Sequence, residues 1–227
     1  MYEYQARQGC TALVDGLGPD GNGDVLNPQN NLTCDRDGDG ILDGNRLFSR
    51  PPLVARLRLT MPGADEWNEL WVIANHWKSK VEDTYWVQYT LPRRLEQAQF
   101  VAALVQEIIQ TDAEASLIVT GDLNDHPDSL PLLEMSAQGL EDLLQRVPHA
   151  QQYTYIYEGV SQSLDYILSR TRPPLYPLQI QAVHINADYP VSLEQEPGVF
   201  YRSSDHDPLW VEIVAFPPQI YLPMISR

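Results

Sequence analysis

Short apolar runs that end in polar residues recur along the chain, and the clearest of them is Ser116–Asp125. Its small and β-branched residues lead into Gly121, and this pattern predicts a buried strand that stops there. Asp122 and Asn124 follow, so we expect a carboxylate and an amide at the carboxyl end of the strand. Such oxygens suit a hard cation, Mg²⁺ or Mn²⁺. An Asx-rich turn that only caps the strand is the alternative.

Alternating or apolar segments predict further strands, and two segments show the spacing of amphipathic helices. The predicted strands are residues 1–8, 53–60, 69–75, 153–157, 163–169, 178–187 and 209–214. The predicted helices are Pro92–Gln110 and Pro131–Leu144. We expect the first helix to connect the strand that ends near His76 to the strand that ends at Asp122, with a role in packing.

The bulk properties of the 227 residues indicate one globular domain with a packed core. The hydrophobic share is 43% and the charged share 20%. No apolar run approaches the roughly 18 residues of a membrane span. The net charge of −16 argues against tight binding of duplex nucleic acid by a basic surface. It is compatible with a phosphate substrate bridged by divalent cations, which locally reverse the sign of the field.

Residues 10–45 are rich in Gly, Asp and Asn, which predicts a long loop. Acids at alternating positions within it have a spacing that wraps oxygens around one Ca²⁺. These acids are Asp35, Asp37, Asp39 and Asp43. Arg46 stands where an EF-hand has its last acid, so the loop resembles the shorter calcium loops of secreted repeat proteins. A solvated acidic turn is the alternative, and residues 20–24 repeat the pattern weakly.

Cys10 and Cys34 flank much of this loop. In an oxidising compartment they would close it and remove chain entropy worth roughly 3 kcal/mol, whereas in the cytosol they would be two unpaired thiols. Residues 1–9 lack the basic start and apolar run of a signal peptide. We therefore expect either a protein that stays inside the cell or one whose true beginning lies upstream.

Three more motifs with polar residues adjoin predicted strands. His76 lies in Asn-His-Trp-Lys-Ser-Lys at a strand end; a lone histidine there is more often structural, but an amide, an imidazole and two lysines together favour a site. Asp165 interrupts an apolar run, and since a buried acid is costly unless paired, we expect it to have a partner such as a histidine. Asp205 and His206 precede Pro208 and offer a metal-facing carboxylate and a base.

These motifs occur in the order found in the endonuclease/exonuclease/phosphatase superfamily, which the chain resembles. They are NHWKSK with His76, GDLND with Asp122 and Asn124, LDYIL with Asp165, and SSDHDP with Asp205 and His206. With LFSRPPL at 47–53, HINAD at 184–188 and YRSSDHDP at 201–208, the chain is most similar to the secreted bacterial nucleases of that superfamily, over roughly residues 48–214.

The resemblance implies an α/β fold, a four-layered DNase I-like sandwich of two mostly antiparallel sheets flanked by helices. It also implies metal-dependent phosphodiester hydrolysis with Mg²⁺ or Mn²⁺, DNA or RNA as substrate, and a monomer. The implied roles are binding of metal, phosphate or water by Asp122 and Asn124, metal binding by Asp205, a general base at His206 oriented by Asp165, and contact of His76 with the phosphate or leaving group.

Two early strands of that family, one ending in an Asn and one in a metal-binding Glu, have no counterpart in this sequence. We therefore expect residues 1–215 to form a partial domain with an insertion at 10–45, followed by a tail at 216–227. A non-catalytic, calcium-stabilised remnant and a phosphomonoesterase or sphingomyelinase-like hydrolase are the alternatives to a nuclease. The cysteines, the calcium-like loop and the family likeness together predict an extracellular protein.

Overall fold

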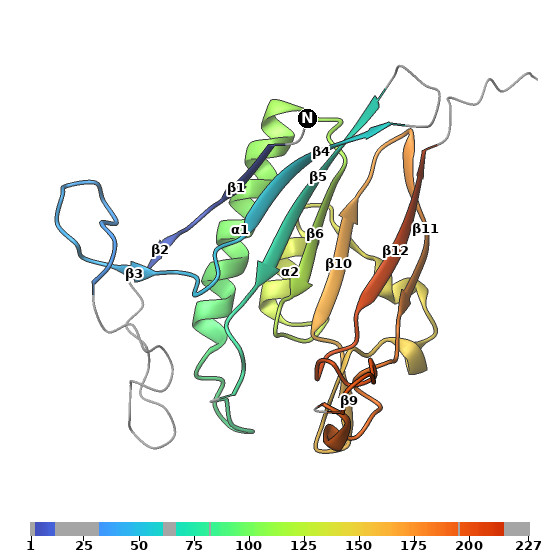
Figure 1. Ribbon diagram of the computed structural model, residues 1–227. Coiled ribbons are helices and arrows are strands. Elements are labelled where there is room, and N and C mark those ends of the chain that lie inside the picture. The colour runs from blue at the N-terminus through green and yellow to red at the C-terminus, as the bar shows by residue number, and fades with distance from the viewer. Residues whose placement is uncertain (1–2, 12–31, 61–66, 82, 195, 216–227) are drawn as a thin grey trace, which may run out of the picture.

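The computed structural model describes residues 3–11, 32–60, 67–81, 83–194 and 196–215 (Figure 1). The weak calcium-like repeat at 20–24 and the expected tail at 216–227 lie outside these residues.

A six-stranded sheet forms the centre of the molecule, in the order β1-β4-β5-β6-β10-β7. Its strands are β1 (Glu3–Ala6), β4 (Leu53–Thr60), β5 (Trp67–His76), β6 (Leu117–Asp122), β10 (Asp165–Arg170) and β7 (Glu141–Asp142). The pair β5 and β6 is parallel, and the other neighbours are antiparallel. A parallel pair requires a crossover connection, and α1 (Leu91–Thr111) supplies it, as the sequence predicted.

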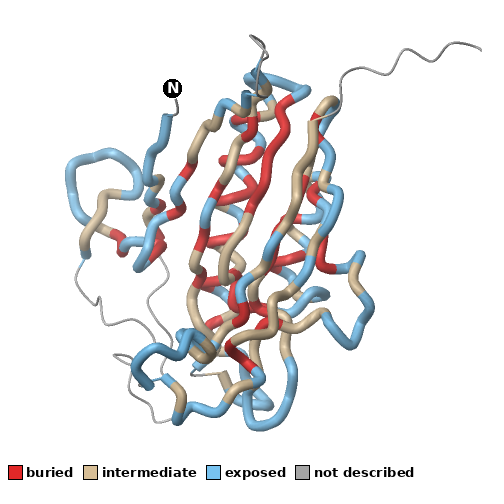
Figure 2. Tube along the Cα trace, turned by 45° about the vertical axis from the view of Figure 1, so that its right-hand side comes forward, coloured by how far each residue is buried: buried red, intermediate tan, exposed pale blue. Residues whose placement is uncertain are grey.

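Both α-helices pack on one face of this sheet (Figure 1). Pro92 lies in the first turn of α1, where its missing N–H costs nothing. The buried side of α1 includes Ala98, Val101 and Val105, which meet Ile73 and other side chains of the sheet in the main core. The second helix, α2 (Leu130–Ser136), adds apolar side chains to the same core, and Figure 2 shows the buried residues gathered along these elements.

A two-stranded sheet, β11 (Leu175–Ala182) and β12 (Leu209–Ala215), covers the opposite face. Apolar side chains of both strands pack against Leu70, Ile118 and Ile167 of the central sheet in a second core. The described residues therefore form a helical layer and two sheets face to face. This confirms the predicted α/β fold class with two sheets face to face. The described residues supply one helical layer, on the central sheet, where four layers were expected.

Smaller elements complete the fold. Cys10 and Cys34 form a disulfide next to the short pair β2 (Cys10–Thr11) and β3 (Asn45–Arg46). The strands β8 (Tyr155–Tyr157) and β9 (Val160–Gln162) form a hairpin, and Tyr155 makes an isolated β-bridge with His206. Single 3-10 turns occur at η2 (Leu143–Arg146), η3 (His149–Gln151) and η4 (Val191–Leu193). None of the described helices combines the length and apolar character needed to cross a bilayer.

Two predicted elements are wrong in extent, and one of them is the strand expected at residues 178–187, which is β11 and ends at Ala182. The helix expected at residues 131–144 ends at Ser136, and Gly139 then takes a left-handed φ of 76°. This conformation suits glycine and ends a helix. The chain then forms β7 and η2, and the apolar residues Leu143 and Leu144 of η2 are fully buried.

Candidate active site

The candidate site lies where β5 and β6 end together. Because these strands are parallel, their carboxyl ends reach the same edge of the sheet, and His76 is registered beside Asp122. Gly121 has a φ of 124°, and a Cβ at this position would lie 2.0 Å from the carbonyl oxygen of Asn75. Only glycine fits that close approach, which explains why Gly121 precedes the acid.

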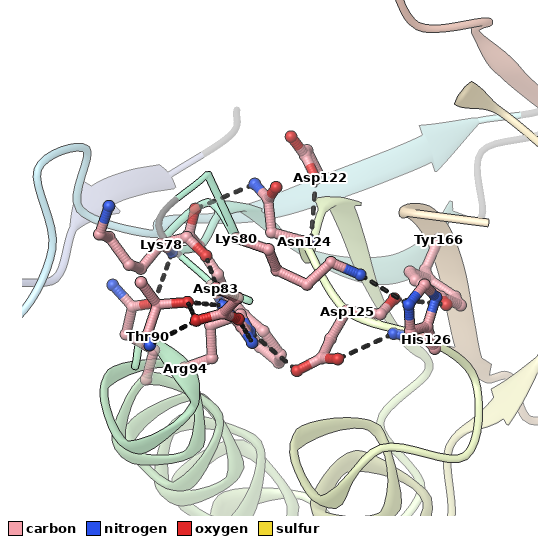
Figure 3. Close-up of polar contacts among 12 residues, drawn as sticks. Lys78, Lys80, Asp83, Thr90, Arg94, Asp122, Asn124, Asp125, His126 and Tyr166 are labelled. Carbon is pink, nitrogen blue, oxygen red and sulfur yellow. Dashed lines mark hydrogen bonds and ion pairs between the residues drawn. The ribbon is translucent and has the colours of Figure 1, made fainter. Parts of the chain in front are cut away.

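Asp122 and Asn124 are held in one turn (Figure 3). One carboxylate oxygen of Asp122 accepts the Asn124 N–H at 2.9 Å, and the other lies 3.9 Å from Nε2 of His76. Asn124 has a φ of 52°, a conformation that asparagine tolerates. Its side-chain nitrogen donates to the carbonyl of Trp77 at 3.1 Å, which leaves its amide oxygen available as a ligand.

His206 and Asp165 form a close pair beside this turn. Nδ1 of His206 lies 2.6 Å from a carboxylate oxygen of Asp165, and Asp165 is registered beside Asp122 across the antiparallel pair β6 and β10. The ring of Tyr155 lies over the imidazole, with centroids 4.6 Å apart. With the Nδ1 proton donated to the carboxylate, Nε2 is the basic nitrogen of the ring.

Charge and burial distinguish the groups of this cluster. Ligand atoms of Asp122, Asp165 and His206 lie within 4.8 Å of one another. Burial raises the pKa of Asp122, and the charge of Asp165 adds to the rise. For His206, burial opposes protonation, but the hydrogen bond and charge of Asp165 outweigh it and the pKa is raised.

The donor set fits a divalent cation. Two half-buried carboxylates close to each other raise the cost of their own ionisation, and a bound cation would offset it. Asp122 and Asn124 provide oxygen ligands of the kind that Mg²⁺ and Mn²⁺ prefer. Among the described residues, no glutamate belongs to the cluster.

The two acids on either side of His206, of which Asp205 was predicted as a metal ligand, lie apart from this arrangement. Asp205 is exposed and stands outside the cluster, although its charge contributes to the raised pKa of His206. Its role as a metal ligand remains a prediction. Asp207, the next acid along, is 2% exposed and accepts from the N–H groups of Ile185, Asn186 and Ala187 and from His184, so it shapes a loop.

The predicted calcium loop is partly assembled. Carboxylate oxygens of Asp35, Asp37 and Asp39 lie within 4.8 Å of one another. Asp43, which the sequence groups with them, stands apart because its two oxygens accept from the backbone and the side chain of Arg36, at 2.8 and 3.1 Å.

A buried polar network behind the site was not predicted (Figure 3). Arg94 is fully buried in the first turns of α1 and forms ion pairs with Asp83 at 3.0 Å and Asp125 at 2.8 Å. It also donates to the hydroxyl of Thr90. Asp125 directly follows Asn124, so this network fixes the turn that carries the candidate ligands. Asp125, the last residue of GDLND, is the one feature of the sequence that indicated this network.

Comparison with known proteins places the chain in context. Residues 46–159 match the sequence model of the Endonuclease/Exonuclease/phosphatase family. No curated protein matches the sequence.

Several solved structures resemble this one. D. rerio TDP2 complexed with a single strand DNA product is 18% identical, with 74% of this chain and 64% of that chain covered and a TM-score of 0.48. The human Nocturnin catalytic domain with bound sulfate is 17% identical, with 71% and 54% covered and a TM-score of 0.45. An endonuclease/exonuclease/phosphatase family protein from Bacteroides thetaiotaomicron is 15% identical, with 73% and 57% covered and a TM-score of 0.47. The chain thus spans less than two thirds of the length of each.

Proposed function

Since the chain belongs to the endonuclease/exonuclease/phosphatase family, we propose that it hydrolyses phosphodiester bonds with a divalent metal ion. The observation that carries this proposal is the 2.6 Å pair of His206 and Asp165 beside the carboxylate of Asp122. An imidazole oriented by an acid, next to an oxygen-rich metal site, can act as a general base that removes a proton from water as the water attacks a charged phosphate.

Each residue then has a definite task. Asp165 holds the imidazole so that Nε2 of His206 can take a proton from the attacking water. Asp122 and Asn124 would hold the metal ion, with Asp205 as a further carboxylate on that side. Bound Mg²⁺ or Mn²⁺ would supply Lewis-acid stabilisation of the phosphate charge. His76, at 3.9 Å from Asp122, would donate a hydrogen bond to a phosphate oxygen or the leaving group.

The proposed substrate is DNA or RNA, and the proposed location is extracellular. A metal-bridged phosphate suits a chain of net charge −16 better than contact with a basic surface does. The disulfide of Cys10 and Cys34 and the grouped acids Asp35, Asp37 and Asp39 support an oxidising, calcium-rich environment. We propose that the protein acts there as a monomer.

One observation favours a second candidate, a non-catalytic module stabilised by calcium. The described residues contain no glutamate at the metal cluster, whereas the acidic loop is partly assembled. The two candidates differ in whether the purified chain cleaves nucleic acid at all.

Plasmid nicking tests this directly. The purified chain is incubated with supercoiled plasmid in Mg²⁺, Mn²⁺, Ca²⁺ or EDTA, and His206→Ala serves as the control for contaminating nucleases. We expect cleavage that requires both metal and His206. A folded chain that cleaves nothing would support the calcium-stabilised module, and full activity of His206→Ala would overturn the assignment of the base.

A further inference from the structure

The chain contains two lysines, Lys78 and Lys80, and both follow His76 directly along the chain. The whole chain has 31 acidic residues and a net charge of −16. Both of its lysine side chains follow closely after His76, at the edge of the sheet that carries the candidate active site.

The structure brings Lys80 to a second basic side chain from the neighbouring loop. Nζ of Lys80 lies 2.8 Å from Nε2 of His126 (Figure 3). An ammonium group only donates, so Nε2 accepts and the remaining ring N–H is on Nδ1. Lys80 keeps two further N–H donors, which makes the pair a source of several donors and one positive charge.

The position of the pair follows from the strand register. His76 lies beside Asp122, and Lys80 and His126 each follow four residues later on the two loops that leave this edge. The loops are tied together, since Trp77 N–H donates to the carbonyl of Asp122 at 2.9 Å and the Asn124 side chain donates to the carbonyl of Trp77. The pair therefore lies beyond the metal-binding turn on the same edge of the sheet.

The nearby acids do not neutralise Lys80. Asp83 and Asp125 are committed to the buried guanidinium of Arg94, at 3.0 and 2.8 Å. Within the described part of the chain, Lys80 has no ion pair, and its hydrogen-bond partner is His126. The side chain is half-buried, so its charge is less screened than that of a fully exposed lysine.

We propose that Lys80 and His126 form a subsite for a second phosphate group of the substrate, one that flanks the phosphodiester being cleaved. This inference rests on the proposed hydrolase function and deepens it. A substrate with several phosphates in a row, a polynucleotide strand, would use the subsite, and a substrate with one phosphate would not fill it.

Binding of a fluorescein-labelled oligothymidylate of 12 nucleotides tests the subsite without relying on cleavage. Fluorescence anisotropy is measured in a His206→Ala background with the metal ion present, over a range of NaCl concentrations. We expect Lys80→Gln to raise Kd by about five- to twentyfold, as for a lost charge-assisted hydrogen bond. The slope of log Kd against log salt should fall by about 0.7, the value for one contact with a single strand.

Matched variants separate the local contact from a general change in charge or fold. Arg172→Gln removes one positive charge just beyond β10, at the opposite end of the sheet from Asp165, and should change neither Kd nor slope appreciably. Lys80→Arg should bind within about threefold of the parent, and His126→Ala, at an exposed position, should weaken binding. If Lys80→Gln and His126→Ala behave like Arg172→Gln, the subsite is refuted.

Hydrolysis distinguishes the subsite from the reacting centre. Bis(p-nitrophenyl) phosphate has one phosphate. The factor by which Lys80→Gln lowers kcat/KM should be at least five times smaller for this substrate than for the oligonucleotide. Equal losses on both substrates would place Lys80 at the reacting phosphate and overturn the proposal. If the parent chain hydrolyses neither substrate, the proposed function fails, and the anisotropy data alone decide whether the subsite exists.

Discussion

Replacement of Arg94 by methionine should destabilise the protein more than any change of a surface charge. Arg94 is fully buried and joins two acids that are themselves nearly inaccessible. The side chains of Asp83 and Asp125 are 10% and 7% exposed. Methionine is unbranched and replaces the aliphatic part of the arginine side chain, so the variant removes the guanidinium and keeps most of the apolar packing around it.

The magnitude follows from what the two carboxylates lose. Removal of one partner of a buried ion pair costs about 3–5 kcal/mol, because the remaining charge is left uncompensated. Water cannot replace Arg94 without entry into the core, so we expect a loss of about 4 kcal/mol in the free energy of unfolding. For a chain of this size that corresponds to a fall in Tm of roughly 8–16 °C.

Urea unfolding followed by tryptophan fluorescence measures the loss, since Trp77 is 1% exposed and lies next to the network. Arg7→Met is the control, because the Arg7–Glu107 pair of 2.8 Å is partly exposed, at 32% and 59%, and should contribute less than about 1 kcal/mol. Equal m-values are needed for the comparison. A loss below about 1 kcal/mol for Arg94→Met, or one equal to that of Arg7→Met, would refute this account of the network.

Three further predictions concern the candidate base, the acidic loop and the disulfide. Asp165→Asn should lower kcat by about 10²–10⁴-fold. Because His206 must be neutral to act as a base and its pKa is raised, the activity of the parent protein should fall as the pH drops through that raised pKa. In Asp165→Asn, which lacks the charge that raises the pKa, the acidic limb of the kcat/KM profile should move to lower pH. A limb at the same pH would contradict the role of Asp165. The double change Asp37→Asn and Asp39→Asn should abolish any Ca²⁺-dependent rise in Tm, and a rise that persists would exclude the loop as the site. Reduction of the Cys10–Cys34 bond should cost about 3 kcal/mol in urea unfolding, and a cost near zero would show that the bond does not constrain the unfolded chain.

The strands and the crossover were predictable because their signal is local. Leu53–Thr60 alternates in the sequence and forms β4 with those bounds. The apolar run before Gly121 forms β6, and the amphipathic pattern after Pro92 forms α1. The cost of a buried acid led to a partner for Asp165, and the structure pairs it with His206. For the strands and the helix, neighbours in the chain carried the information, whereas His206, 41 residues from Asp165, was indicated as the partner by the resemblance to the family.

Features that depend on distant residues were not predictable. From the sequence, a charged residue such as Arg94 at the start of a helix is expected to face solvent. Arg94 is buried because Asp83 and Asp125 approach it from two other loops. The pairing of Lys80 with His126 likewise depends on two loops that are 46 residues apart in the chain. The shortened α2 was missed because the apolar spacing continues past Gly139, while tertiary packing assigns the later residues to β7 and η2.

The parallel register of β5 and β6 makes the site more sensitive to the number of residues in these strands than to the identity of each residue. Successive residues of a strand point to opposite faces of the sheet. Deletion of one residue within Trp67–His76 would therefore either turn His76 away from Asp122 or force a bulge. Substitutions inside the strands disturb packing at one point, whereas an insertion or deletion displaces every side chain downstream. Libraries that diversify this protein should therefore alter side chains within β5 and β6 and confine changes of length to the loops beyond Lys80 and His126.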